Sequence, residues 1–325
     1  MENKKIKHLI AIGTALLTIA VFPPSSKTMA STKISGSPII ENICAETKFK
    51  SSLLASKIKN LQNKTPQEKV NLLYEIFAVK NGGLKISDSQ KDNRPPRDID
   101  ETITKGGDCS EFVLVIAASL KYLGLNGGAL IVRIDGKEEN DIHIVAYADI
   151  GEKIIIDPQA DRINKILDGK KYKVLAELTL EQLKYVYFRE YGDYYYNKQD
   201  YKKAIKKYEE AYCLYKEDLY VSYSLALSYQ RIGNLKKAFY YATKFLNFRK
   251  EKLKDFFPKN HQKYVMSASR IIVEAKIEEG VEKYNSGNKE VAKKLFEEAL
   301  EIGEKNSVID NEEKEIIKNY IKNCE

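Results

Sequence analysis

The spacing of apolar and polar residues changes several times along the first half of the chain, and each change predicts a different element. Thr65-Pro66-Gln67-Glu68 is a strong helix start, and apolar positions then recur at helical spacing. This predicted helix ends at Gly82-Gly83. Residues 81–106 are rich in Gly, Pro, Asp and Lys and predict a long loop. The further expected elements are helices over Lys48–Gln62 and Cys109–Leu123, and strands over Ala129–Ile134, Ile142–Ala148 and Lys153–Ile156. A helix followed by an antiparallel meander is an α+β pattern.

From about Tyr185 the pattern becomes helical and acquires an internal period of 34 residues. The positions Gly192, Tyr195, Tyr201, Ala204, Tyr208 and Ala211 recur as Ala226, Tyr229, Leu235, Ala238, Ala242 and Phe245. A third copy lies around Gly280, Gly287, Ala292, Phe296 and Ala299, after an inserted segment near 250–270. Small residues return where two helices approach closely, so residues 185–303 resemble tetratricopeptide repeats. Residues 310–325 predict a polar helix that caps the array.

The N-terminus carries the pattern of an export signal. Three lysines precede a 14-residue apolar run, Leu9 to Phe22, and Pro23-Pro24 ends it. Thr28-Met29-Ala30 then offers the small residues that a signal peptidase reads. A membrane-spanning helix needs about 20 residues. We therefore expect a cleaved signal over 1–30 and an extracytoplasmic protein that is secreted, periplasmic or at the cell surface. An uncleaved N-terminal anchor is the alternative.

Composition and charge narrow the function classes. The chain has 325 residues, of which 43% are hydrophobic and 31% charged, as in ordinary folded proteins. Residues 1–30 contribute +3 of the formal charge of +8, and no block of Lys or Arg stands out, so nucleic acid is not an expected partner. The four cysteines (Cys44, Cys109, Cys213, Cys324) have neither metal-type spacing nor the density of a disulfide framework. No metal and no cofactor is predicted.

One cysteine has surroundings that favour reactivity. In Gly106-Gly107-Asp108-Cys109 two glycines end the loop, Asp108 is a natural N-cap, and an apolar helix begins at once. Cys109 is thus expected in the first helical turn, where free backbone N–H groups and the helix dipole favour a thiolate. A thiolate is the nucleophile of thiol enzymes. A buried, inert cysteine is the alternative at this position.

A histidine and a carboxylate complete the candidate site. His8 lies in the signal and His261 between repeats, so only His143 shares a domain with Cys109. If residues 142–157 form a hairpin centred on Ile150, His143 lies directly opposite Asp157 on the same face of the sheet. A carboxylate there would hold one ring nitrogen and orient the other toward the thiol. A turn residue before Pro158 is the alternative for Asp157.

These residues together resemble the transglutaminase-like superfamily of papain-type folds. The resemblance covers Gly107 to Gln159 and comprises a Gly-x-Cys motif that opens a helix, a His about 30 residues on, and an Asp-Pro after the next strand. It includes Cys-Ser-Glu-Phe at 109–112 and Tyr-Leu-Gly-Leu at 122–125. It implies that Cys109 is the nucleophile, His143 the general base and acid, and Asp157 the orienting carboxylate. Family members often carry an aromatic residue where this chain has Val145.

The sequence thus predicts a papain-like, transglutaminase-like domain followed by an all-α array of tetratricopeptide type. The expected boundaries are 1–30 for the signal, 31–175 for the thiol domain and 185–325 for the repeats. The expected function is acyl transfer at a thiol, in first place as a peptidase or amidase acting on a protein or peptide. A transglutaminase-like transfer to an amine is the second possibility. The repeats are expected to bind a protein partner or the substrate. The competing hypothesis is an inactive scaffold that binds partners through its repeats.

Overall fold

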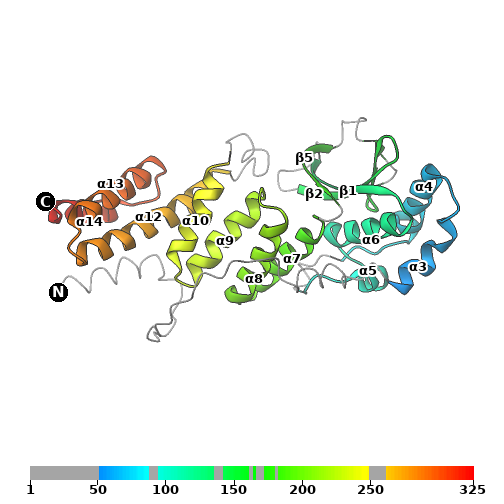
Figure 1. Cartoon of the computed structure of the whole chain (residues 1–325), viewed down its shortest axis with the longest axis horizontal. Coiled ribbons are helices and arrows are strands. Elements are labelled where there is room, and N and C mark those ends of the chain that lie inside the picture. The colour runs from blue at the N-terminus through cyan, green and yellow to red at the C-terminus, as the bar shows by residue number, and fades with distance from the viewer. Residues whose placement is uncertain are drawn as a thin grey trace. The chain divides into compact units, whose positions relative to one another are not determined.

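The structure is a computed structural model that describes residues 51–87, 94–134, 142–160, 164–165, 172–179, 182–248 and 261–325. The predicted signal and Cys44 lie outside these residues. The fold is α+β and mostly helical, with one antiparallel sheet (Figure 1). No helix of the described part is both long enough and apolar enough to cross a membrane.

The sheet has five strands in the order β4-β3-β2-β1-β5, with every neighbouring pair antiparallel. The strands are β1 (Asn126–Ile134), β2 (Ile142–Asp149), β3 (Lys153–Ile156), β4 (Asn164–Lys165) and β5 (Tyr172–Thr179). The first three coincide closely with the predicted strands, although β1 begins earlier and includes Gly127 and Gly128. A Cβ on Gly127 would meet a side-chain atom of Leu120 at 2.9 Å, so this glycine allows a helix to lie close to the sheet. Strand β5 extends to Thr179 and pairs with β1 on both sides of residue 175, the expected end of the thiol domain.

Six helical segments precede the sheet in the part of the chain that the structure describes. They are α3 (Ser52–Ile58), η1 (Lys59–Leu61), α4 (Pro66–Phe77), η2 (Val79–Asn81), α5 (Ile99–Lys105) and α6 (Cys109–Tyr122). Thr65 caps α4 through a capping box with Glu68, as the sequence predicts. The prediction of a loop over 81–106 is wrong for α5, because the Asp98 carboxylate accepts the Glu101 N–H and starts a short helix there. Helix α6 is almost wholly buried and lies below the sheet in Figure 1.

The two faces of the sheet differ in what they contact. Val145 and Tyr147 alternate with Ile144, Ala146 and Ala148 along β2, as predicted. The face that carries His143 has its own buried cluster, which consists of Leu130, Val132, Val145, Tyr147, Ile155 and Tyr172. The opposite face, with Gly127, meets Leu120 of α6. The sheet is therefore buried on both sides.

After the sheet the described chain forms helix pairs that share one turn geometry. The pairs are α7 (Lys184–Asn197) with α8 (Tyr201–Leu214), α9 (Leu219–Arg231) with α10 (Leu235–Leu246), and α12 (His261–Asn285) with α13 (Lys289–Lys305). Each turn holds one residue at positive φ, namely Gln199, Gly233 and Gly287, followed by an Asp or Asn that caps the next helix. Gln199 and Gly233 are 34 residues apart, so the sequence period corresponds to one helix pair.

Close approach between paired helices occurs at small residues, as the repeat pattern predicts. A Cβ on Gly192 would lie 2.4 Å from the ring of Tyr208, and one on Gly280 would lie 2.6 Å from that of Phe296. The buried Ala226 and Ala242 occupy the equivalent positions in the middle pair. In each pair, a glycine or alanine on the first helix thus allows close contact with an aromatic residue or alanine on the second helix.

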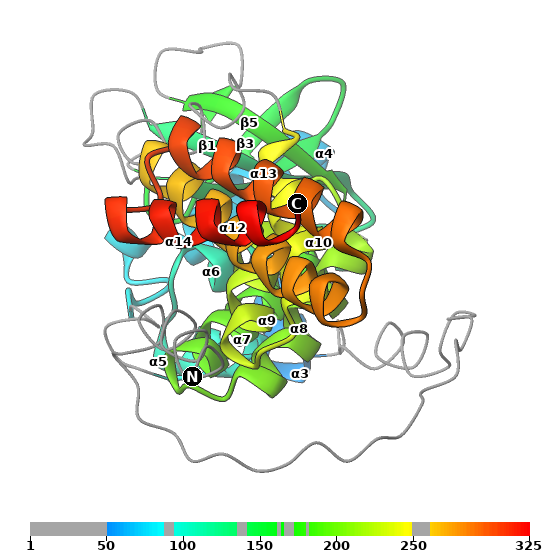
Figure 2. The ribbon, with the colours of Figure 1, turned by 90° about the vertical axis from the view of Figure 1, so that its left-hand side faces the viewer.

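The chain divides into two compact units, and the division falls within α12. Phe49–Ala275 contains the sheet together with α3 to α10. The described part of the other unit is Lys276–Glu325, where α14 (Asn311–Asn323) packs against α13 (Figure 2). Its core contains Ala292, Phe296, Ile317 and Cys324. The predicted helix over 310–325 is confirmed, and α7 to α10 share a unit with the sheet.

Candidate active site

Cys109 is the first residue of α6, and its position follows from local chemistry. The Asp108 carboxylate accepts the N–H groups of Ser110 and Glu111, while the Glu111 carboxylate accepts the N–H of Asp108 at 3.0 Å. This capping box fixes the point at which the helix starts. The N–H of Cys109 itself has no hydrogen-bond partner among the residues that the structure describes. The partly exposed thiol therefore lies beside an unoccupied donor at the positive end of a helix.

A buried ion pair, which the sequence did not reveal, anchors the loop before α6. Arg94 donates to Glu111 from its two terminal guanidinium nitrogens, at 2.6 and 2.8 Å, and the Arg97 backbone N–H donates to the same carboxylate at 2.5 Å. Glu111 is only 2% exposed. Gly106, at φ 88°, passes so close to Lys85 that a Cβ would lie 2.3 Å from its carbonyl oxygen. These contacts bind the segment 94–107 to the first turn of the cysteine helix.

His143 and Asp157 lie in contact. The Nε2 atom of His143 is 3.0 Å from Oδ2 of Asp157, and both residues are buried. The Asp157 carboxylate also accepts the Gln159 N–H at 2.9 Å through Oδ1. Because Nε2 is occupied, Nδ1 is the ring nitrogen left for the thiol, and Cys109 lies close enough to His143 to contribute to the raised pKa of the imidazole. The structure thus brings all three predicted site residues together.

The predicted pairing of His143 with Asp157 is wrong in its register. The hairpin pairs Ala146 with Ile156 and Asp149 with Lys153, so its centre is Gly151 and not Ile150. Gly151 has φ 98°, a conformation that favours glycine, which explains the centre of this three-residue loop. The paired numbers therefore sum to 302, and Asp157 follows the last pair at the level of Val145. His143 is its diagonal neighbour on the same face, which is within reach of side chains of this length.

Burial and hydrogen bonding have opposite effects on the two ionisable partners. Burial alone lowers the pKa of His143, but the hydrogen bonds to Asp157 and Cys109 outweigh it and raise the pKa to about 10. For Asp157, burial raises the pKa, but the contact with His143 and further donors hold it below its ordinary value. Both shifts favour an imidazolium–carboxylate pair at neutral pH.

This pair predicts a stability that depends on pH. The pKa of His143 is higher in the folded state than the ordinary value of 6.5, so its contribution is complete below pH 6.5 and is lost as the pH rises through about 10. We expect the stability advantage of the wild type over His143→Gln to shrink by about 3 kcal/mol between pH 6.5 and 10. Urea denaturation of both proteins at several pH values measures this difference. A difference that stays constant or grows with pH would show that His143 is not held protonated.

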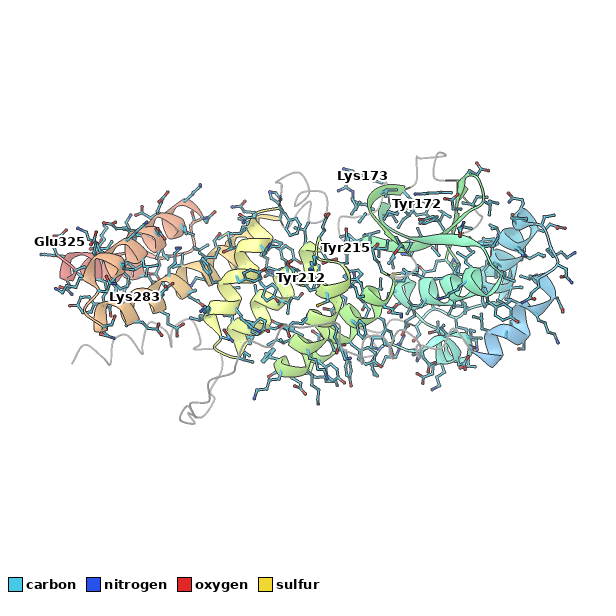
Figure 3. The ribbon with its side chains drawn as sticks, viewed as in Figure 1. Tyr172, Lys173, Tyr212, Tyr215, Lys283 and Glu325 are labelled. Carbon is cyan, nitrogen blue, oxygen red and sulfur yellow. The ribbon has the colours of Figure 1, made fainter. Side chains whose placement is uncertain are left out.

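Tyr172 is a further residue of the site that the sequence did not single out. Its hydroxyl donates to Oδ2 of Asp157 at 3.1 Å, the same oxygen that contacts His143. Tyr172 begins β5 (Figure 3), a strand that was not predicted. It is buried in the cluster with Val145 and Tyr147. No local signal marks it, because its contact with Asp157 depends on the pairing of β5 with β1.

Helix α7 reaches the loop that precedes the cysteine helix. The Tyr191 hydroxyl donates to the carbonyl oxygen of Pro96 at 3.3 Å. Glu190 is paired with Arg189, and burial together with the nearby charges of Asp108 and Glu111 raises its pKa. The first helix pair therefore adjoins the N-terminal end of α6, within the same compact unit.

A second cluster of buried carboxylates lies between the helix pairs and takes no part in the thiol site. The Asp193 carboxylate accepts the hydroxyl groups of Tyr208 at 2.6 Å and Tyr220 at 3.2 Å. Burial raises the pKa of Asp193 to about 7. Tyr208 is thus a core residue whose hydroxyl has a hydrogen-bond partner.

Metal chemistry has no evident site in the described part of the chain. No group of three or more His, Cys, Asp or Glu side chains among those residues is arranged to hold a metal ion. The three described cysteines are all free thiols.

Comparison of the sequence with protein-family models gives no match, and comparison with curated proteins gives none either.

Proposed function

We propose that the protein is a thiol acyl-transfer enzyme, in first place a peptidase or amidase, with Cys109 as nucleophile. The observation that carries the proposal is the chain of contacts from a buried carboxylate, through an imidazole, to a cysteine at a helix N-terminus. Asp157 fixes the ring of His143, and His143 stabilises the thiolate. A buried structural cysteine needs none of these partners.

The geometry supports a two-step reaction. The Cys109 thiolate adds to the carbonyl carbon of an amide, and the Cys109 N–H donates to the oxygen that becomes negative. Protonated His143 gives its proton to the leaving amine as the C–N bond breaks, which leaves a thioester on Cys109. Neutral His143 then takes a proton from water as that water attacks the thioester, and the thiolate leaves. With an amine in place of water, the same steps transfer the acyl group.

We place the chain, as a proposal, among papain-type folds of the transglutaminase-like superfamily, followed by tetratricopeptide-type repeats. Support for the first part is a cysteine-bearing helix that packs on an antiparallel sheet which supplies the His and the Asp. Support for the second part is the common turn of the three helix pairs and the 34-residue period. The approach of α7 to the Pro96 loop gives the repeats a way to influence what reaches Cys109. Export rests on the N-terminal sequence alone.

Capture of an acyl-enzyme tests the proposal. The full chain is mixed with a defined set of peptides, quenched in acid and digested, and the fragment containing Cys109 is weighed by mass spectrometry. We expect a mass increase equal to an acyl group in the wild type and none in Cys109→Ala. A primary amine added to the reaction distinguishes acyl transfer to water from transfer to the amine by the product formed.

The scaffold hypothesis makes the opposite prediction in the same experiment. If no acyl group is found on Cys109 with any peptide, while the intact chain retains a protein partner equally well as wild type and as Cys109→Ala, the repeats carry the function. The intact chain is required because α7 to α10 share a compact unit with the sheet.

A further inference from the structure

Asp157 is held by more than His143, and the additional contact comes from the far edge of the sheet. The Tyr172 hydroxyl lies 3.1 Å from Oδ2 of Asp157, and His143 Nε2 lies 3.0 Å from the same atom. The Gln159 N–H occupies the other oxygen. We propose that Tyr172 is a positioning residue of the thiol site, which holds the Asp157 carboxylate ionised and turned toward His143. This inference rests on the proposed function of Cys109, His143 and Asp157.

An irregularity in β5 allows Tyr172 to take this position. Along β1, Ile131 pairs with Ala176 but the next residue, Val132, pairs with Val174, so Leu175 is an extra residue in β5. Side chains alternate between the faces of a strand, and one extra residue moves every later side chain to the other face. If β5 kept its regular register beyond Ala176, Leu175 would pair with Val132, and Tyr172 would point to the face opposite to His143. The bulge thus brings Tyr172 onto the face that carries the site.

The contact has an electrostatic consequence for Asp157. Burial raises the pKa of this carboxyl, and the His143 contact, the Gln159 N–H and the Tyr172 hydroxyl together hold it low. Loss of one of these donors should therefore raise the pH at which Asp157 takes up a proton. A protonated Asp157 no longer stabilises the imidazolium, so the Cys109 thiolate loses its support at a higher pH.

Tyr147 provides a matched comparison for a purely structural role. It lies in the same buried cluster as Tyr172, and its hydroxyl also donates to a carboxylate. That carboxylate is Glu177, at 2.5 Å, which pairs with Lys153 and not with Cys109, His143 or Asp157. Tyr147→Phe and Tyr172→Phe each remove one hydroxyl that donates to a carboxylate, but only the second removes a donor to Asp157.

The test is the pH profile of Cys109 alkylation by iodoacetamide, measured between pH 3 and 8 on the full chain by peptide mass spectrometry. We expect Tyr172→Phe to move the acid limb upward by about 0.5–1 pH unit, and therefore to slow alkylation about fivefold at a pH on that limb. Tyr147→Phe should leave both unchanged. Replacement of Tyr172 by 3-fluorotyrosine, a stronger hydrogen-bond donor of nearly the same shape, should move the acid limb downward. This variant tests the inference even where Tyr172→Phe fails to fold.

The same series separates this inference from the proposed function. If His143→Ala slows alkylation but the Tyr172 variants keep the wild-type profile, Tyr172 has no positioning role and the thiol site stands. An equal shift in Tyr147→Phe would assign the effect to the cluster and overturn the inference. If alkylation does not depend on His143 at all, the proposed function and the inference fall together.

Discussion

Replacement of His143 by Ala is expected to slow the alkylation of Cys109 at pH 6 by about 100-fold. An ordinary cysteine, with a pKa near 8.5, is roughly 0.3% thiolate at that pH. The protonated imidazole beside Cys109, itself held by Asp157, places a positive charge next to the sulfur that reacts. Removal of the imidazole leaves only the helix N-terminus to support the anion, which is the weaker effect.

The chain contains its own reference for this measurement. Cys213 is an exposed free thiol on α8, and it should react at the same rate in the wild type and in the variant. Asp157→Asn should give an intermediate loss of about tenfold, since an amide still accepts a hydrogen bond but carries no charge. Equal rates for Cys109 in the wild type and His143→Ala would remove the basis of the enzyme hypothesis.

Local signals gave correct predictions where a few neighbouring residues decide the structure. The capping boxes at Thr65 and Asp108 place the starts of α4 and α6. The 34-residue period corresponds to the helix pairs, because close approach requires small residues at fixed positions. The apolar runs after Gly128 correspond to strands, and one of them, Lys153–Ile156, has its predicted bounds.

Three features of the site could not be predicted from the sequence, because each depends on how segments of the chain pair. The diagonal relation between His143 and Asp157 depends on which residue of the loop takes positive φ, and Gly151 takes it. The contact of Tyr172 with Asp157 depends on a bulge in β5, and this bulge is defined by the pairing of β5 with β1. The partner of Glu111 is Arg94, within a stretch of Pro and charged residues that predicted only a loop. Gly151 lies within the hairpin itself, whereas the contacts of Tyr172 and Glu111 depend on residues farther away in the chain.

Replacement of Glu111 by Gln is expected to lower the free energy of unfolding by about 3–5 kcal/mol, the usual cost of breaking a buried ion pair on one side. All of the groups around this carboxylate are donors: two guanidinium nitrogens of Arg94 and the N–H groups of Arg97 and Asp108. The amide nitrogen of a glutamine would face one of them and leave Arg94 without its counter-charge. Urea denaturation, followed by circular dichroism, measures the loss.

Two comparisons show whether the loss comes from the pair itself. Glu101 forms an exposed ion pair with Lys105 on the neighbouring α5, and Glu101→Gln should change stability by less than about 0.5 kcal/mol. Arg94→Met leaves Glu111 buried without its cation, so it should cost about as much as Glu111→Gln. The loss of unfolding free energy in the double variant should then be smaller than the sum of the two single losses, by at least about 2 kcal/mol. Additive losses would mean that Arg94 and Glu111 stabilise the protein independently, and that the loop 94–97 is held to the cysteine helix by other contacts.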